Sequence, residues 1–260
     1  MTPFTYAKTT STCPCGQHTR FNKLTSHSSG GKCWTCDKFF PPERESKSDS
    51  LKDYYNSFPK EKTTMEQTPH STPKTFIREH IYWNETGDNY LMKVMIYKDN
   101  SGKKHCYQYK WEGTIEWNDN EQAFTKRGTW LPGIEGVNLT LYNAELINIF
   151  RASKHSDEFV VYIVEGEKDV DTLWHKCGLL ATCNPMGAGK WKNSYSDILK
   201  GLNCIILPDN DEVGKSHAQM VYDSLKGKAN KVMIYNLTNS MPDLPKKGDV
   251  TDFIERGGTL

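Results

Sequence analysis

The segments FVVYIVEGEKD (residues 159–169) and NCIILPDNDEVGK (residues 203–215) decide the predicted fold of this chain. Each begins with a short apolar run, rich in β-branched residues and without clean alternation, which is typical of a strand buried on both faces. LLATC (residues 179–183) and KVMIY (residues 231–235) are two further runs of this kind. Helical patterns follow them, at residues 168–177, 195–200 and 212–225. This succession of strands and helices predicts an α/β domain with a parallel sheet.

Acidic residues stand after the predicted strands. They are Glu165 and Asp169 in VEGEKD, Asp209 and Asp211 in LPDNDEVGK, and Asp249 and Asp252 in KGDVTDF. Ligands of parallel sheets bind beyond the carboxyl ends of the strands, so Glu165 and Asp209 are expected at the same edge. Carboxylates a few Å apart repel by about 1 to 4 kcal/mol per pair, depending on the local dielectric. Such a cluster therefore favours a divalent cation, and oxygen-only ligands suit Mg²⁺ or Mn²⁺.

The order E-G-x-x-D, then D-x-D-x-x-G, then D-x-x-D resembles the TOPRIM domain that bacterial-type primases, topoisomerases and some nucleases share. The resemblance covers residues 158–260 and implies the TOPRIM parallel-sheet fold. It also implies catalytic roles for six residues. Glu165, Asp209 and Asp211 would be the core magnesium ligands, and Asp169, Asp249 and Asp252 would support them. A solvated acidic rim on an ordinary doubly wound domain is the alternative interpretation.

Five potential zinc ligands lie within the first 36 residues, in the segments CPCGQH and KCWTC. Two ligand pairs separated by a short insert are the pattern of a structural tetrahedral zinc site. Cys33 and Cys36 form one pair. Cys15 with His18 is the favoured second pair, because a two-residue spacing lets both side chains face one ion. Cys13 remains the alternative fourth ligand.

C-x-x-H followed by C-x-x-C resembles the zinc-binding module at the start of bacterial-type replicative primases, and phage primase-helicases carry a similar ribbon with four cysteines. The resemblance implies that residues 1–40 form a zinc ribbon that reads a short template sequence. Its hairpin strands are expected at Phe21 and at residues 37–40. The additional Cys13 departs from the family pattern.

Two segments of different character lie between the ends. Residues 41–73 are rich in Ser, Thr, Lys, Glu and Pro and hold too few apolar residues to offset the entropy of ordering, which predicts a flexible linker. Residues 74–157 alternate apolar and polar residues, with a hairpin turn at residues 99–102 and a helix near residues 144–152. This pattern predicts an antiparallel, strand-rich subdomain, and the primase family places a basic module of this kind ahead of TOPRIM in its polymerase core.

Basic residues are the candidates for nucleotide and template binding. By the primase resemblance, phosphates would contact Lys168, Lys190, Lys93, Lys103, Lys104, Lys110 and Arg127. Ordinary solvated strand faces are the alternative for the residues of the strand module, and a plain glycine-containing loop is the alternative for Lys190. Aromatic residues at strand spacing are either platforms for stacked bases or core residues; they are Tyr107, Tyr109, Trp111, Trp117 and Trp130.

The predicted function is a DNA primase, a nucleotidyltransferase (DNA-directed RNA polymerase) that makes short RNA primers on single-stranded DNA by two-metal catalysis. The primase would act in the DNA replication of a phage, a plasmid or another mobile element. The resemblance implies ribonucleoside triphosphates as substrates, Mg²⁺ or Mn²⁺ and Zn²⁺ as cofactors, and a replicative helicase as partner. A TOPRIM-type nuclease and a non-catalytic single-stranded nucleic-acid-binding adaptor are the alternative functions.

Composition sets outer limits on these predictions. The chain has 260 residues, of which 25% are charged and 36% hydrophobic, enough for one or two domain cores beside a small zinc unit. Its net charge of +1 does not by itself indicate nucleic-acid binding, although local patches can steer a polyanion. No run is apolar enough to span a bilayer, and no membrane partner is expected. Cysteines at zinc spacing predict a reducing compartment, the cytoplasm of a bacterial host.

Overall fold

The computed structural model of the chain describes residues 73–118, 123–152 and 159–260, and the backbone of four short strands nearer the N-terminus. The side chains of residues 117, 118, 123 and 124 lie outside this description. The chain divides into two compact units, Met1–Pro69 and His70–Leu260.

The first unit contains an antiparallel sheet of four strands in chain order. These are β1 (Tyr6–Ser11), β2 (Phe21–Leu24), β3 (Gly31–Cys33) and β4 (Phe39–Phe40). Among the predicted zinc ligands, Cys33 ends β3, and its side chain is not described. Cys13, Cys15, His18 and Cys36 lie outside the described residues. The zinc site therefore stays a prediction.

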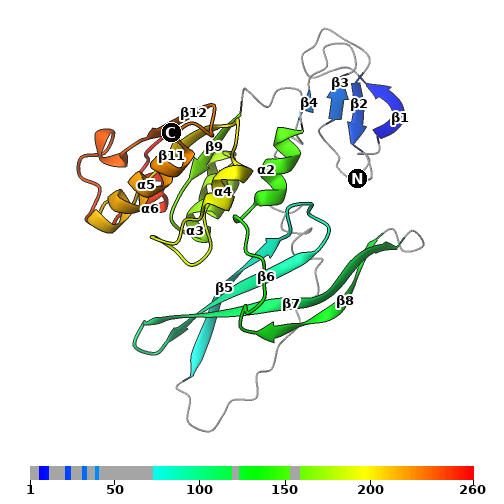
Figure 1. The fold of residues 1–260 in the computed structure, drawn as a ribbon, viewed down its shortest axis with the longest axis horizontal. Helices are drawn as coiled ribbons and strands as arrows, with labels where there is room; N and C mark the ends of the chain where they lie inside the picture. The colour runs from blue at the N-terminus through cyan, green and yellow to red at the C-terminus, as the bar shows by residue number, and fades with distance from the viewer. Residues whose placement is uncertain are drawn as a thin grey trace. The chain divides into compact units, whose positions relative to one another are not determined.

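The second unit begins with the predicted antiparallel sheet, whose strands follow one another in chain order (Figure 1). They are β5 (Lys74–Trp83), β6 (Tyr90–Asp99), β7 (Lys104–Asn118) and β8 (Ala123–Pro132). The predicted hairpin turn joins β6 to β7. There one Asp99 carboxylate oxygen accepts the N–H groups of Ser101 at 2.9 Å and Lys103 at 3.0 Å, and Gly102 takes a φ of 86°. The alternating pattern thus marked a sheet with an Asp-initiated turn.

A parallel four-stranded sheet makes up the other half of this unit. Its strands are β9 (Val160–Ile163), β10 (Ala181–Thr182), β11 (Asn203–Ile206) and β12 (Lys231–Ile234), in the spatial order β10-β9-β11-β12. Each lies inside an apolar run that predicted it and is shorter than that run. Because β9 lies beside β11, the residues that follow these two strands emerge next to each other.

The helices of the described residues are short, apart from one. They are α2 (Ala144–Arg151), α3 (Glu167–Thr172), α4 (Asn193–Ile198), α5 (Glu212–Leu225) and α6 (Val250–Glu255), with a 3₁₀ turn η2 (Leu237–Asn239). The longest, α5, has the predicted bounds. The helix predicted at residues 168–177 is divided, because α3 passes into a π-helical turn, η1 (Leu173–Cys177), that closes at Gly178 in the left-handed region.

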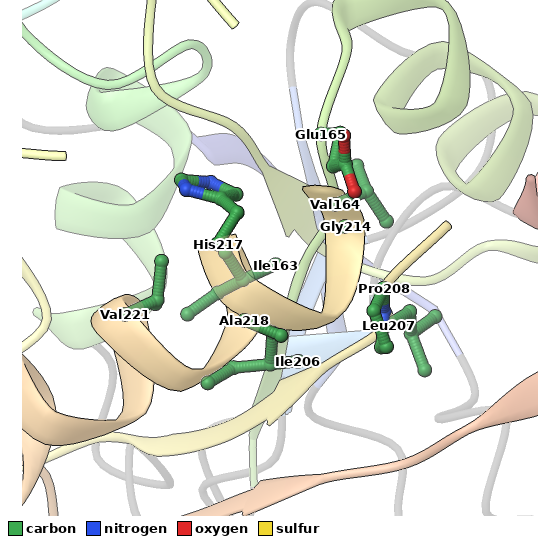
Figure 2. A pocket seen from close by; sticks show the side chains of 10 residues that line it. All are labelled: Ile163, Val164, Glu165, Ile206, Leu207, Pro208, Gly214, His217, Ala218 and Val221. Carbon is green, nitrogen blue, oxygen red and sulfur yellow. The ribbon is translucent and has the colours of Figure 1, made fainter. Parts of the chain in front are cut away.

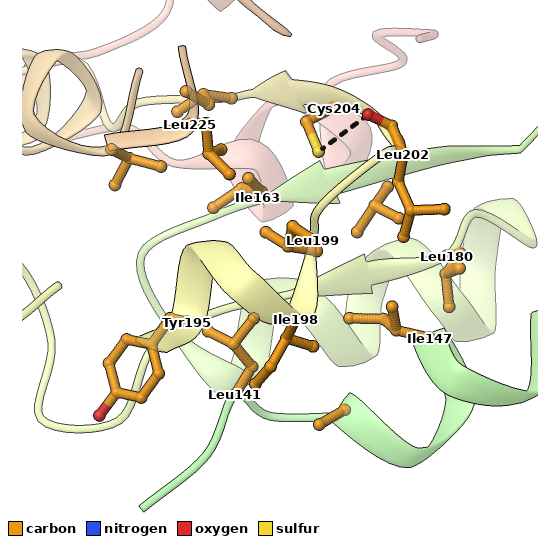
Figure 3. Close-up of a cluster of buried hydrophobic side chains, with 14 of the residues drawn as sticks. Leu141, Ile147, Ile163, Leu180, Tyr195, Ile198, Leu199, Leu202, Cys204 and Leu225 are labelled. Carbon is orange, nitrogen blue, oxygen red and sulfur yellow. Dashed lines mark hydrogen bonds between the residues drawn. The ribbon is translucent and has the colours of Figure 1, made fainter. Parts of the chain in front are cut away.

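Two apolar clusters hold the parallel sheet from its two faces. One cluster combines residues of β9 and β11 with α2, α4 and α5, and Leu141, Ile163 and Leu199 in it are almost fully buried (Figure 3). The other combines α3, η1 and α6 with residues of the antiparallel sheet, including Tyr82 and Met92. The sheet is therefore a middle layer, and its strand ends are fixed by packing on both sides. None of the helices in the described ranges has the length and hydropathy that crossing a membrane requires.

Candidate functional site

The carboxyl edge of the parallel sheet gathers five acidic residues, here called the acidic edge: Glu165, Asp169, Asp209, Asp211 and Asp249. Glu165 follows β9 and Asp209 follows β11, and the Asp209 N–H donates a hydrogen bond of 3.2 Å to Glu165 Oε1. These two predicted metal residues are therefore in direct contact.

Burial and mutual repulsion disfavour the ionised forms of this pair. Burial, followed by the charges of Glu165, Asp169, Asp249 and Asp211, raises the pKa of Asp209 to about 8. Burial is also the main cause that raises the pKa of Glu165, with further contributions from the neighbouring aspartates. The site thus holds carboxylate charge that the protein only partly compensates.

Helix α5 begins at this edge and needs glycine in its first turn. Asp211 is its N-cap, and Asp211 Oδ1 accepts the N–H of Gly214 at 2.8 Å. A Cβ atom added to Gly214 would lie 2.4 Å from Glu165 Oε1 and 2.7 Å from the Asp209 carbonyl oxygen. No real Cβ approaches so closely, so the glycine of D-x-D-x-x-G lets the helix start against the two carboxylates.

A small cavity of about 10 Å³ lies behind this contact, between β9, β11 and α5 (Figure 2). Its lining is mostly apolar, and Glu165, Gly214 and His217 are the exceptions. A cavity of this size holds at most one water molecule. It is a packing gap beneath the acidic edge rather than a ligand site.

Lys168 partly offsets the negative charge of the edge nearest α6. Its ammonium group binds the Asp249 carboxylate and lies 3.4 Å from Asp169 Oδ1. Although burial lowers the pKa of Lys168, the bond to Asp249 and the charge of Asp169 raise it overall. Asp169 is buried and accepts a hydrogen bond of 2.7 Å from Thr251 Oγ1. Lys168, predicted to contact phosphate, is thus an internal counter-charge in this structure.

Asp249 and Asp252 form a capping box at the start of α6. Asp249 Oδ1 accepts the N–H of Asp252 at 2.9 Å, and Asp252 Oδ2 accepts the N–H of Asp249 at 3.2 Å. The sequence signal for this structural role was the D-x-x-D spacing itself, which is also the spacing of a capping box. Their predicted catalytic support remains a prediction.

The carboxylates of the acidic edge suit a hard cation by their chemistry but not by their present arrangement. Among the described residues, no group of three or more His, Cys, Asp or Glu side chains is arranged to hold a metal ion. The oxygens face backbone N–H groups and Lys168 instead. Glu165 and Asp209 nevertheless offer carboxylates whose raised pKa values mark uncompensated charge, which is what a divalent cation would relieve.

The loop after β10, with the sequence Met186-Gly187-Ala188-Gly189-Lys190, lies against α5. Met186, Gly187 and Gly189 all have φ between 72° and 76°. The Gly189 N–H donates a hydrogen bond of 3.1 Å to His217 Nδ1, so the proton of this neutral imidazole lies on Nε2. Lys190 itself is exposed.

His217 is a buried residue that the sequence did not single out. Burial lowers its pKa, which favours the neutral form that accepts the loop N–H. Its Nε2 has no hydrogen-bond partner within the described residues. The only sequence signal was its place on the buried face of a helix, which any core residue shares.

The basic residues of the antiparallel sheet differ in their surroundings. Lys93 is buried, with its ammonium group 3.4 Å from Glu79 Oε2 and 4.9 Å from the centroid of the Trp130 ring. Lys110 contacts the Glu135 carbonyl oxygen at 3.4 Å. Lys103, Lys104 and Arg127 are exposed. Their predicted contacts with phosphates remain predictions, and Lys93 in this position belongs to the packing of the sheet.

Aromatic residues of this sheet pack mainly on one another. The Trp111 and Trp130 ring centroids lie 5.0 Å apart, and the Tyr90 centroid lies 5.5 Å from each of them. Tyr107 accepts a hydrogen bond of 2.6 Å from Lys74 Nζ. The side chain of Trp117 lies outside the description. These contacts match the core alternative for the aromatic residues.

The antiparallel sheet is joined to the parallel half by polar contacts near the acidic edge. Tyr82 OH, on β5, donates a hydrogen bond of 2.6 Å to Glu167 Oε1. Gln108 Nε2 donates to Met186 Sδ at 3.0 Å, so β7 reaches the glycine loop. The sheet therefore stands on the β10 side of the edge.

Comparison with known proteins gives weak structural likenesses. No family model matches the chain, and no curated protein matches it. One similar solved structure is the DnaG primase catalytic domain bound to ssDNA, with a TM-score of 0.37 and 12% identity over 63% of this chain and 54% of that chain. The E. coli primase catalytic core gives a TM-score of 0.37 and 15% identity over 69% of this chain and 54% of that chain.

A third similar structure is that of the bacteriophage T7 lagging-strand DNA polymerase interacting with primase domains of two gp4 subunits, an RNA/DNA hybrid and dTTP. It gives a TM-score of 0.30 and 13% identity over 97% of this chain and 93% of that chain. The chain spans about half the length of the first two structures. At these scores, a functional assignment depends on the site itself.

Replacing Gly214 by Ala tests the close approach of α5 to the acidic edge. An exposed helical Gly→Ala change normally stabilises a protein, but here the Cβ would overlap Glu165 and Asp209. We expect a loss of about 1 to 3 kcal/mol in the free energy of unfolding, as for other overpacked sites. Val213→Ala, at the exposed neighbouring position, is the control for denaturant unfolding. A Gly214→Ala variant as stable as the wild type would contradict the described contact.

Replacing His217 tests its hold on the glycine loop. His217→Leu keeps apolar bulk but removes the acceptor, so amide hydrogen exchange at Gly189 should become about tenfold faster, as for loss of about 1.4 kcal/mol. His217→Asn places an oxygen near the position of Nδ1 and should restore most of the protection. Because the folded pKa lies below the unfolded value, the stabilisation by His217 is present above pH about 6.5 and is lost as the pH falls. Equal exchange in all three proteins would refute the role.

Proposed function

We propose that this chain is a DNA primase that makes short RNA primers on single-stranded DNA by divalent-cation-dependent nucleotidyl transfer. The observation that carries the proposal is the direct contact between Glu165 and Asp209 at the carboxyl edge of a parallel sheet, with both carboxyl pKa values raised. A surface rim of solvated acids would show neither burial nor raised pKa values. The contact therefore favours a catalytic site over the alternative of a solvated acidic rim.

Glu165, Asp209 and Asp211 are the residues that would hold magnesium or manganese. When bound, such ions neutralise triphosphate charge and activate the 3′-hydroxyl of a primer for attack. Glu165 contributes a carboxylate whose Oε1 accepts the Asp209 N–H, and Asp209 contributes a carboxyl group whose pKa burial and neighbouring acids raise. Asp211 has one oxygen engaged with Gly214, which leaves its second oxygen for a ligand. The side chains must rotate from their present positions, since the described arrangement does not yet hold an ion.

The other residues of the edge set the electrostatics of the site. Asp169 and Asp249 hold Lys168 at the α6 end, so that one positive charge partly offsets these two carboxylates. A phosphate that approaches from this end meets the Lys168 ammonium group. On the β10 side, exposed Lys190 and the backbone of the glycine loop provide the second positive contact for phosphates.

The remaining parts of the proposal follow from the sequence. Residues 1–40 would be a zinc ribbon that reads the template from the linker at residues 41–73. Residues 74–157 and 158–260 would form the polymerase core, with the first part contacting the template backbone. Ribonucleoside triphosphates, a replicative helicase and the cytoplasm of a bacterial host complete the proposed setting, for a phage or another mobile element.

A nuclease of the TOPRIM type would use the same carboxylates, so the reaction must be tested directly. Template-dependent incorporation of labelled ribonucleotides with Mg²⁺ would support the primase. Cleavage of single-stranded DNA without incorporation would support the nuclease, and binding without either reaction would support the adaptor. The antiparallel sheet is attached beside the acidic edge. This favours the primase, because a template strand needs a surface to lie on beside the catalytic carboxylates.

Asp209→Asn tests the role of the acidic edge in this reaction. Loss of one cation ligand removes several kcal/mol of transition-state stabilisation, so primer synthesis should fall by roughly a hundredfold or more. The fold should persist, because the change removes a repelling charge and keeps the shape. Asp243→Asn, at an exposed position, is the control. Undiminished synthesis by Asp209→Asn would exclude the assignment.

The same variant makes a prediction for metal-free stability. The folded pKa of Asp209, about 8, lies above its ordinary value of 3.8, so stability is lost as pH rises from about 4 to about 8. Above pH about 8, Asp209→Asn should therefore raise the melting temperature in chelator, by about 2 to 4 °C per kcal/mol regained. Added Mg²⁺ should stabilise the wild type more than the variant. A variant less stable than the wild type at high pH would contradict the described repulsion.

A further inference from the structure

A second, larger hollow lies on the β12 side of the acidic edge. Its volume is about 460 Å³, and its walls come from Asp209 and Asn210, from Lys215 and Gln219 of α5, and from Ile234 and residues 236–239. This is within the size range of small-molecule sites and far larger than the gap beneath α5. Asp209 belongs to both the acidic edge and the hollow, so a ligand in the hollow adjoins the proposed metal site.

Asn210, the middle residue of the Asp-Asn-Asp motif, fixes one wall of this hollow. Its N–H donates to the Gly248 carbonyl at 2.9 Å, and its own carbonyl accepts the N–H of Lys247 at 2.9 Å. Its side-chain amide donates to the Leu244 and Pro245 carbonyls at 2.9 Å and 3.1 Å. Four hydrogen bonds thus bind the 244–248 loop to the acidic motif. The hollow is preformed rather than a gap between loose loops.

The lining of the hollow combines an apolar base with uncharged polar groups. Pro208, Leu237 and Leu244 are buried and give the apolar part. Asn236, Thr238, Asn239 and Gln219 bring amide and hydroxyl groups, which both donate and accept hydrogen bonds. Nucleobases present apolar faces and edges of mixed donors and acceptors, and ribose adds hydroxyl groups. The lining therefore suits a nucleoside better than a phosphate, because Lys215 is the one cation among the described residues that line the hollow.

The hollow and the glycine loop lie beside the two outer strands of the parallel sheet, β12 and β10. In the sheet order β10-β9-β11-β12, the glycine loop follows β10, Glu165 follows β9, Asp209 follows β11, and the hollow adjoins the end of β12. Three inter-strand spacings separate the outer strands, or about 14 Å. That span is comparable with the length of an extended nucleoside triphosphate.

We propose that the hollow is a nucleoside subsite, which holds the base and ribose of a ribonucleoside triphosphate whose phosphates lie along the acidic edge. This inference rests on the proposed function for the class of its ligand. Asparagine and glutamine groups at the hollow then contact the base edge, while Asp209 lies where base and triphosphate meet.

Filling the hollow tests the subsite by equilibrium binding. Asn239→Trp, at an exposed rim position, places an indole in the space, and Asn230→Trp, exposed at the opposite end of β12, is the matched control. The probes are ATP, GTP, CTP, UTP and inorganic tripolyphosphate, each titrated with Mg²⁺ against the full chain. We expect Asn239→Trp to weaken each nucleotide by about tenfold or more, equivalent to about 1.4 kcal/mol, while tripolyphosphate binding stays unchanged. Asn230→Trp should bind all five like the wild type.

A second variant distinguishes loss of nucleotide binding from misfolding of Asn239→Trp. Asn236→Leu keeps the size of the side chain but removes its amide donor and acceptor, and it should weaken nucleotide binding without affecting tripolyphosphate binding. Nucleotide binding by Asn239→Trp and Asn236→Leu as tight as that of the wild type would overturn the subsite. So would wild-type binding of tripolyphosphate as tight as that of the nucleotides. The expected pattern without template-directed synthesis would instead overturn the primase proposal and leave the subsite in place.

Discussion

The contact between the Glu165 carboxylate and the Asp209 N–H is the constraint on which the functional half of the molecule depends. It requires β9 and β11 to be neighbours, so that the residues after them meet. It also requires α5 to begin at once, with glycine at the point of closest approach. The packing of helices on both faces of the sheet holds this geometry against the repulsion of the acids. The free energy of the apolar core thus supports an electrostatically unfavourable edge.

The protein compensates the charge of the edge unevenly. Asp211 and Asp249 are stabilised by backbone N–H groups at helix starts, and the single charge of Lys168 is shared between Asp169 and Asp249. Within the described parts of the chain, no such partner is found for the Asp209 carboxyl group, and its pKa is raised to about 8. The point of least compensation is where an added cation gains most. The raised pKa, more than the number of acids, therefore locates the proposed cation site.

Local sequence pattern was sufficient for the elements but not for the roles of single residues. The apolar runs located the four strands of the described parallel sheet, and the helical pattern at residues 212–225 gave the bounds of α5. Lys93 shows the limit, because its burial depends on Glu79 and Trp130 from two other strands, which no local pattern reveals. His217 and Lys168 likewise have partners that are distant in sequence. The helix predicted at residues 168–177 was divided by a π-helical turn, which the sequence pattern did not indicate.

The two sides of the acidic edge differ, and this difference bears on the choice between functions. On the β10 side, Gln108 and Tyr82 attach the antiparallel sheet and so give the edge a wall. On the β12 side, the edge opens into the preformed hollow beside Asn210. Cleavage of a phosphodiester needs one strand laid over the carboxylates. Template-directed synthesis needs a template and a nucleotide that meet at the metal site. We therefore infer that the antiparallel sheet binds the template and that the hollow binds the nucleotide.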